Sequence, residues 1–153
     1  MKFISFFAFG GAVATLGNQS YLTWLADTFI KVGVDPDFGY QDAVLYLGFE
    51  KAYELSKDEQ YLDWYKGQID GHVVQEDGTI RNWNYSRYIL DEYRMGNNYL
   101  YLYDQTGDKK YKSAAEIVRS MLDSYPRTPS GGFWYGIRKH AHSLPVFHLL
   151  TWI

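Results

Sequence analysis

The chain has 153 residues, which is enough for one domain with a core of its own. Its 15 basic and 18 acidic residues are well mixed and give a net charge of -3, so no nucleic-acid-binding surface is indicated. The chain has no cysteine, which excludes disulfides, thiolate metal sites and a cysteine nucleophile; its 19% aromatic content suits either a sugar-stacking site or a tyrosine-rich core.

The first 17 residues have the pattern of a secretory signal peptide. Lys2 provides a positive start, residues 3–14 are almost wholly apolar, and residues 12–14 (Ala-Val-Ala) are small residues at cleavage spacing. The stretch is shorter than the roughly 18 residues that a membrane-spanning helix needs. A buried N-terminal helix is the alternative, and the glycine pair at residues 10–11 disfavours it. The sequence therefore predicts a secreted, extracellular protein without a membrane partner.

After the leader, apolar residues recur at helical rather than alternating spacing. The first predicted helix carries an apolar stripe behind a Ser20 N-cap, and the stripe consists of Tyr21, Trp24, Leu25, Phe29 and Ile30. Further helices are expected over residues 44–55, from residue 61, over 90–103 and over 108–124. Breaks are expected at 35–39, at a turn or small hairpin over 75–80 and at a loop over 126–132. The chain is therefore predicted to be all-α.

An internal repeat organises these helices. Residues 53–61 (Tyr-x-x-Ser-x-Asp-x-x-Tyr) recur at 103–111 (Tyr-x-x-Thr-x-Asp-x-x-Tyr), and each copy marks a helix end, an Asp-capped turn and a new helix. The unit is thus a helical hairpin of about fifty residues, within the range of repeat architectures. A hairpin cannot bury its apolar face without neighbours, and only about two and a half units fit before residue 125. An incomplete domain with an apolar flank on its first and last hairpins is expected.

Four segments together resemble glycoside hydrolase family 105, the unsaturated rhamnogalacturonyl hydrolases. They are residues 40–41 (Tyr-Gln), 90–92 (Leu-Asp-Glu), 102–108 (Leu-Tyr-Asp-Gln-Thr-Gly-Asp) and 126–134 (Pro-Arg-Thr-Pro-Ser-Gly-Gly-Phe-Trp). The last is the most specific, and the resemblance covers about residues 20–135. It implies an (α/α)6 toroid, of which residues 18–135 would be the N-terminal part.

The resemblance also implies a reaction. An aspartic acid protonates C4 of the C4=C5 double bond that a polysaccharide lyase leaves on a uronyl sugar. Water then adds at C5, and the hemiketal opens to release the neighbouring sugar. The reaction belongs to pectin and rhamnogalacturonan breakdown, takes a small unsaturated oligosaccharide as substrate and requires no cofactor or metal. It needs a carboxyl group that is protonated at working pH and then acts as a base towards water.

Three residues match the family's site by this resemblance. Asp91 corresponds to the inner-helix aspartate that supports catalysis and contacts the sugar; its alternative role is a helix-start carboxylate favoured by the helix dipole. Tyr40 corresponds to a substrate-binding aromatic, or else is a core tyrosine. Trp134 lies on the loop that leads to the pocket, or else packs beneath that loop. Glu92 is expected to be structural, because it points about 100° away from Asp91 on a helix.

The chain departs from the family after residue 135. Tyr135 stands where a histidine is common, and the helix that carries the proton-donor aspartate is absent, because no Asp or Glu follows Asp123. Residues 136–153 form a divergent tail with a proline at position 145. His140 and His142 are a poor metal-ligand set, because no carboxylate or cysteine accompanies them. A truncated, inactive hydrolase is therefore expected, and a sugar-binding remnant and a non-catalytic helical-repeat scaffold are the alternatives.

Overall fold

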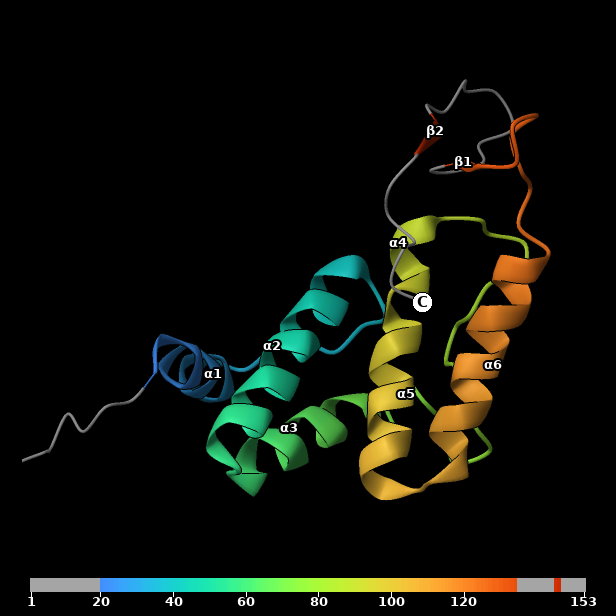
Figure 1. Ribbon diagram of the computed structural model, residues 1–153. Helices are drawn as coiled ribbons and strands as arrows, with labels where there is room; N and C mark the ends of the chain where they lie inside the picture. The colour runs from blue at the N-terminus through green and yellow to red at the C-terminus, as the bar shows by residue number, and fades with distance from the viewer. Residues whose placement is uncertain (1–19, 135–144, 147–153) are drawn as a thin grey trace, which may run out of the picture.

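The computed structural model describes residues 20–134 and 145–146, and these form a mostly helical structure (Figure 1). The helices are α1 (Tyr21–Val32), α2 (Tyr40–Ser56), α3 (Glu59–Ile69), α4 (Leu90–Tyr93), α5 (Met95–Thr106) and α6 (Lys109–Asp123). Two short antiparallel strands, β1 (Phe133–Trp134) and β2 (Pro145–Val146), pair Phe133 with Val146. The all-α class is confirmed. The predicted signal peptide (1–17) and all of the tail except β2 lie outside the described residues.

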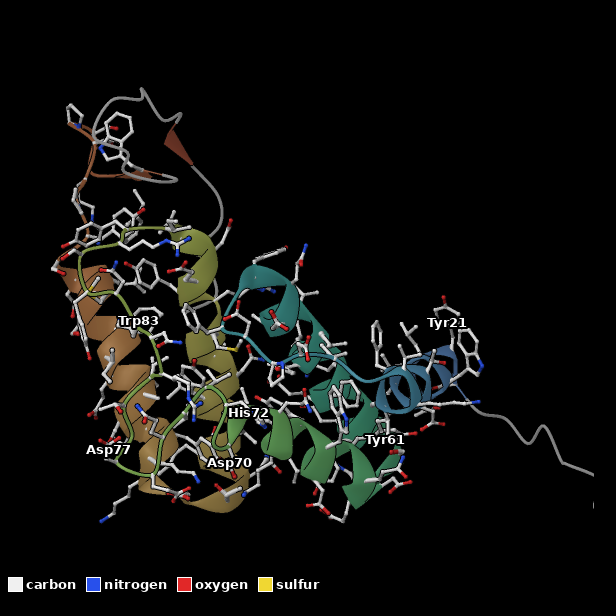
Figure 2. All side chains as sticks on the ribbon, turned by 180° about the vertical axis from the view of Figure 1, so that it is seen from behind. Tyr21, Tyr61, Asp70, His72, Asp77 and Trp83 are labelled. Atoms are coloured by element: carbon white, nitrogen blue, oxygen red, sulfur yellow. The ribbon has the colours of Figure 1, made fainter. Side chains whose placement is uncertain are left out.

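Helix α1 begins where the sequence predicts but turns a different face inward. Ser20 caps it, because its Oγ accepts a hydrogen bond of 3.2 Å from the backbone N–H of Thr23. The buried positions are Thr23 and Ala26, whereas Tyr21 is 75% exposed and Trp24 is 51% exposed. Tyr21 lies at the outer end of α1, away from the other helices (Figure 2). The predicted stripe is therefore exposed at these two positions, whereas Phe29 and Ile30 of the same stripe are partly buried against the core.

The turn between α2 and α3 has the capping geometry that the repeat predicts. The Ser56 hydroxyl donates to the carbonyl of Ala52 at 2.8 Å and accepts from the backbone N–H of Asp58 at 3.1 Å. Asp58 caps α3 by accepting from the N–H of Gln60 at 3.0 Å. Lys57 joins the two helices in the left-handed conformation, with φ of 59°.

The turn between α5 and α6 repeats this network. The Thr106 hydroxyl donates to the carbonyl of Leu102 at 2.7 Å and accepts from the N–H of Asp108 at 3.2 Å. Asp108 accepts from the N–H of Lys110 at 3.0 Å, and Gly107 takes the left-handed position with φ of 71°. The sequence repeat is therefore confirmed as a structural repeat.

The last tyrosine of each repeat fastens its hairpin to the preceding segment. The Tyr61 hydroxyl donates to Asp27 Oδ1 in α1 at 2.9 Å, and the Tyr111 hydroxyl donates to Asp70 Oδ1, just after α3, at 2.6 Å. Equivalent residues thus make equivalent links to the neighbouring unit, as stacked helical hairpins require.

The helix predicted over 90–103 is divided into α4 and α5 at Arg94. The backbone of Arg94 stays in the right-handed helical region. The Arg94 carbonyl accepts a hydrogen bond of 3.2 Å from the N–H of Asn97, three residues later, which tightens the turn. At the start of α5, Gly96 approaches α6 so closely that an added Cβ would lie 3.1 Å from Val118 Cγ1.

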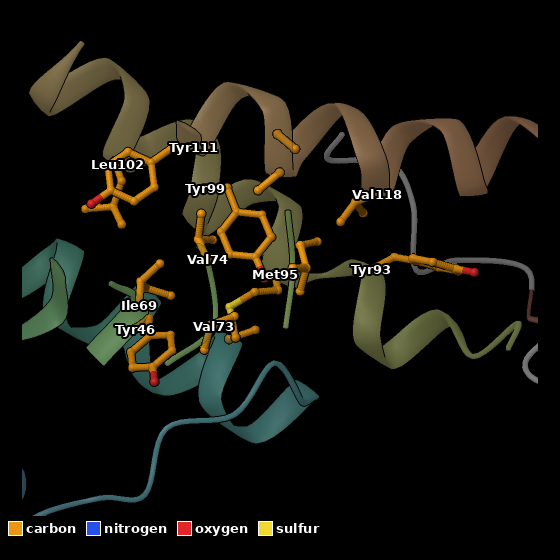
Figure 3. Close-up of a cluster of buried hydrophobic side chains, with 14 of the residues drawn as sticks. Tyr46, Ile69, Val73, Val74, Tyr93, Met95, Tyr99, Leu102, Tyr111 and Val118 are labelled. Carbon is orange, nitrogen blue, oxygen red and sulfur yellow. The ribbon is translucent and has the colours of Figure 1, made fainter. Parts of the chain in front are cut away.

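The core is rich in tyrosine and lies between α2, α3, α5 and α6 (Figure 3). Five tyrosines are almost completely buried: Tyr46, Tyr65, Tyr93, Tyr99 and Tyr111. The segment after α3 folds back over them through Val73, Val74 and Ile80, and Val74 pairs with Ile80 across the predicted turn. Much of the aromatic content therefore serves packing.

Helices α2 and α4 begin at the same end of the molecule, and β1 lies at that end too (Figure 1). The two capped turns lie at the other end. Each outer hairpin carries an apolar groove, of about 290 Å³ between α1 and α2 and about 210 Å³ beside α5 and α6. The apolar flanks expected of an incomplete ring are thus present. In the described ranges, no helix is long and apolar enough to cross a membrane.

Candidate functional site

Two of the three predicted site residues lie where helices α2 and α4 begin, and the third lies in β1. Tyr40 is the first residue of α2 and is 44% exposed, which does not fit a core tyrosine. Asp91 is the second residue of α4 and is half-buried. Trp134 is half-buried in β1, so both of its expected roles stay open. A carboxylate at the start of a helix is stabilised by the helix dipole, which fits the local position of Asp91.

An arginine connects Tyr40 to the helix that carries Asp91. The guanidinium carbon of Arg94 lies 5.7 Å from the centroid of the Tyr40 ring, within the range of a cation–π contact. Arg94 follows Asp91 by three residues, and residues at that spacing share a helix face. The structure therefore brings the Tyr40 ring and the Asp91 face of α4 together.

A second chain of contacts leads from Asp91 to the loop that holds Trp134. Burial and, second to it, the Asp91 carboxylate raise the pKa of Tyr125 to about 12. The Tyr125 ring meets the Phe133 ring edge-on, with centroids 5.4 Å apart, and Phe133 is the neighbour of Trp134 in β1. Trp134 is thus linked to Asp91 through Phe133 and Tyr125.

The loop before β1 is held in a tight turn by its own residues. The Thr128 N–H donates to the carbonyl of Gly132 at 2.8 Å, and the Gly132 N–H donates to Thr128 Oγ1 at 3.0 Å. Gly131 has φ of +85°, a conformation that side chains other than glycine rarely adopt. The Arg127 guanidinium covers the Phe133 ring at 3.4 Å. The Gly-Gly pair therefore serves this turn through its backbone, because an added Cβ at Gly132 would lie 3.3 Å from Thr128 Oγ1.

Further carboxyl groups near this end were not identified as site candidates from the sequence. Burial, opposed by backbone hydrogen bonds and reinforced by Asp37, raises the pKa of Asp42 in the first turn of α2. Burial also raises the pKa of Glu92; its ion pair with Arg87 at 3.1 Å offsets the rise, and Asp37 and Asp91 add to it. Glu92 thus has the structural partner that its helix position suggested. Asp42 follows the start of α2 by two residues, the one local signal that could have identified it.

The arrangement offers aromatic rings, carboxyl groups and a guanidinium side by side, which suits an acidic sugar. Within residues 20–134 and 145–146, no group of three His, Asp or Glu side chains is placed to hold a metal ion. His140 and His142 lie outside the described residues.

A family model described as Glycosyl Hydrolase Family 88 matches residues 19–144. The unsaturated rhamnogalacturonyl hydrolase YesR of Bacillus subtilis (strain 168) is 27% identical over 126 residues, which are 80% of this chain and 33% of that protein.

A solved structure gives the same result. A glycoside hydrolase from family 105 of C. acetobutylicum ATCC 824 has a TM-score of 0.72 and 31% sequence identity, over 77% of this chain and 33% of that one. The resemblance seen in the sequence is confirmed. The chain spans about a third of the length of these relatives.

Proposed function

Because the chain belongs to glycosyl hydrolase family 88, we propose that its site binds the unsaturated uronyl sugar at the end of a small oligosaccharide from pectin or rhamnogalacturonan. One observation carries the proposal: the common end of α2 and α4 presents Tyr40, Asp91 and Arg94 together, beside the loop that holds Trp134. Secretion into the medium where such polymers are degraded is part of the proposal and is supported by the pattern of residues 1–17.

Each residue has a proposed role in the reaction that adds water across the C4=C5 double bond. The Tyr40 and Trp134 rings offer flat apolar surfaces for the sugar ring. Asp91, as a carboxylate, stabilises the positive charge that develops at C5 and the ring oxygen after C4 is protonated. A second carboxyl group near Asp91 would keep its own proton more firmly through like-charge repulsion. Asp91 is therefore the supporting carboxylate rather than the donor.

Asp91 is assigned the supporting role, so the proton donor is not among the residues proposed here. A general acid contributes roughly 10²–10⁴-fold to the rate. For this chain, which spans about a third of the length of its relatives, we therefore propose binding of the unsaturated sugar. The family match favours this role over a helical-repeat scaffold, which has no reason to place Asp91 and Tyr40 at one end.

The test is the affinity of the chain for an unsaturated rhamnogalacturonan disaccharide, measured by calorimetry or by NMR titration. Asp91→Asn should weaken binding by about tenfold or more, because a hydrogen bond to a charged group contributes about 1.5–3 kcal/mol. Asp104→Asn, an exposed aspartate in α5 near the opposite end, is the matched control and should leave affinity unchanged.

Two results would contradict the proposal. Equal affinities for the Asp91→Asn variant and the unchanged chain would make Asp91 a helix-start residue only. No binding of the disaccharide by the unchanged chain would remove the sugar site altogether.

A further inference from the structure

The guanidiniums of Arg94 and Arg127 each lie over an aromatic ring, and Arg94 differs from the exposed Arg127 in being half-buried. Arg87 and Arg119 form ion pairs with carboxylates, and Arg81 donates to a backbone carbonyl. Arg94 is half-buried, and its contact is the face of the Tyr40 ring. Among residues 20–134 and 145–146, no oxygen accepts a hydrogen bond from its side chain. Its guanidinium has five N–H donors that a ligand can engage.

The electrostatic surroundings make this arrangement unusual. Several carboxyl groups gather at this end of the molecule. The charge of Asp37 adds to the raised pKa of Asp42 and of Glu92, and the charge of Asp91 adds to that of Glu92. Glu92 already has a cationic partner in Arg87. An anionic ligand that approached Asp91 would be repelled unless a cation met it. Arg94 lies one helical turn from Asp91 and supplies that charge.

We propose that Arg94 binds the carboxylate of the unsaturated uronyl sugar, with Tyr40 holding the guanidinium plane in position. Arginine suits this role, because its rigid fork of N–H donors matches both oxygens of a carboxylate. The cation–π contact with Tyr40 restricts the side chain before the ligand arrives, which reduces the entropy lost on binding. Arg94 would thereby select acidic over neutral sugars. This assignment rests on the proposed function, because it names the group of the same substrate that the site recognises.

The experiment compares two ligands: the unsaturated uronyl disaccharide and its neutral methyl ester. The unchanged chain should bind the acid roughly ten- to a hundredfold more tightly than the ester, as expected for a charge-assisted bidentate contact. Arg94→Gln should lower the affinity for the acid to that for the ester and leave the ester's affinity within about twofold. Arg119→Gln, in the exposed ion pair of α6, is the matched control and should keep the full preference.

A second measurement does not depend on the variant's folding. In the unchanged chain, the side-chain N–H resonance of Arg94 should shift on titration with the acid and stay in place with the ester. A shift with both ligands or with neither overturns the assignment.

The outcomes separate this assignment from the proposed function. A folded Arg94→Gln variant that keeps the preference for the acid overturns the role of Arg94 and leaves the sugar site intact. An unchanged chain that binds neither disaccharide overturns the proposed function, and the assignment falls with it.

Discussion

Glu50 is a buried carboxyl group whose burial favours its protonated form. It is 5% exposed in α2 and lies between Tyr65 of α3 and Asn98 of α5. The Tyr65 hydroxyl is 2.7 Å from the carbonyl of Asn98 and 3.0 Å from Glu50 Oε1, which also accepts from Asn98 Nδ2 at 2.7 Å. The Tyr65 hydroxyl therefore shares its proton between two acceptors, and the Glu50 carboxyl receives hydrogen bonds from both Tyr65 and Asn98.

The pH dependence of stability follows from this environment. Burial raises the pKa of Glu50 from its ordinary value of 4.5 to about 7, although the Asn98 and Tyr65 hydrogen bonds oppose the rise. Between these values the folded chain binds more protons than the unfolded chain, so its free energy of unfolding falls as the pH rises. At about 1.4 kcal/mol for each pH unit, the loss is complete above pH 7 and amounts to about 3 kcal/mol.

Glu50→Gln tests this reasoning, because glutamine imitates the protonated acid at every pH. Urea unfolding followed by circular dichroism should give nearly equal stabilities at pH 5. At pH 8.5 the variant should be more stable by up to about 3 kcal/mol. Glu54→Gln, an exposed change in the same helix, is the control and should show no such divergence. A Glu50→Gln variant that is less stable than the unchanged chain at pH 8.5 would refute the protonated carboxyl.

Two further changes test local features by the same urea assay at fixed pH. Asp58→Ala and Asp108→Ala should each lower the free energy of unfolding by about 1 kcal/mol, because each removes an N-cap; a loss at one position only would contradict the equivalence of the two turns. Gly78→Ala should lower the free energy of unfolding more than Gly71→Ala does. Both glycines have positive φ, but an added Cβ at Gly78 would lie 2.6 Å from Ser113 Cβ, whereas an added Cβ at Gly71 would meet open space. Equal costs would remove the close packing against α6 as a cause.

The hairpin turns could be predicted from the sequence because their interactions are local. The Ser56 and Thr106 hydroxyls bond to the carbonyl four residues earlier, and Asp58 and Asp108 cap the N–H groups two residues later. Such patterns depend on spacing along the chain alone. The sequence repeat therefore located both turns and the helices on either side of them.

The sequence predictions failed where tertiary packing determines which side chains are buried or meet. The inward face of α1 depends on where α2 lies, and it buries Thr23 and Ala26. Apolar periodicity had favoured Trp24 instead. The site shows the same limit: Asp91 and Tyr40 were identified through a family resemblance, whereas Arg94 carries no motif. It became a candidate only when the fold placed it over the Tyr40 ring.

The capped turn and the proposed sugar site lie at opposite ends of α2, so changes in one should affect stability and changes in the other should affect ligand binding. Helix α2 has 17 residues, which span about 25 Å at 1.5 Å per residue. Tyr40 stands at one end of that length and the Ser56 turn at the other, and α4 and α5 repeat the order from Asp91 to Thr106. Changes in residues that far apart, with no shared partner, act independently on free energy. A change at Asp58 that alters the melting behaviour should therefore leave sugar affinity unaltered in the folded chain, whereas changes at Asp91 or Arg94 act on affinity directly.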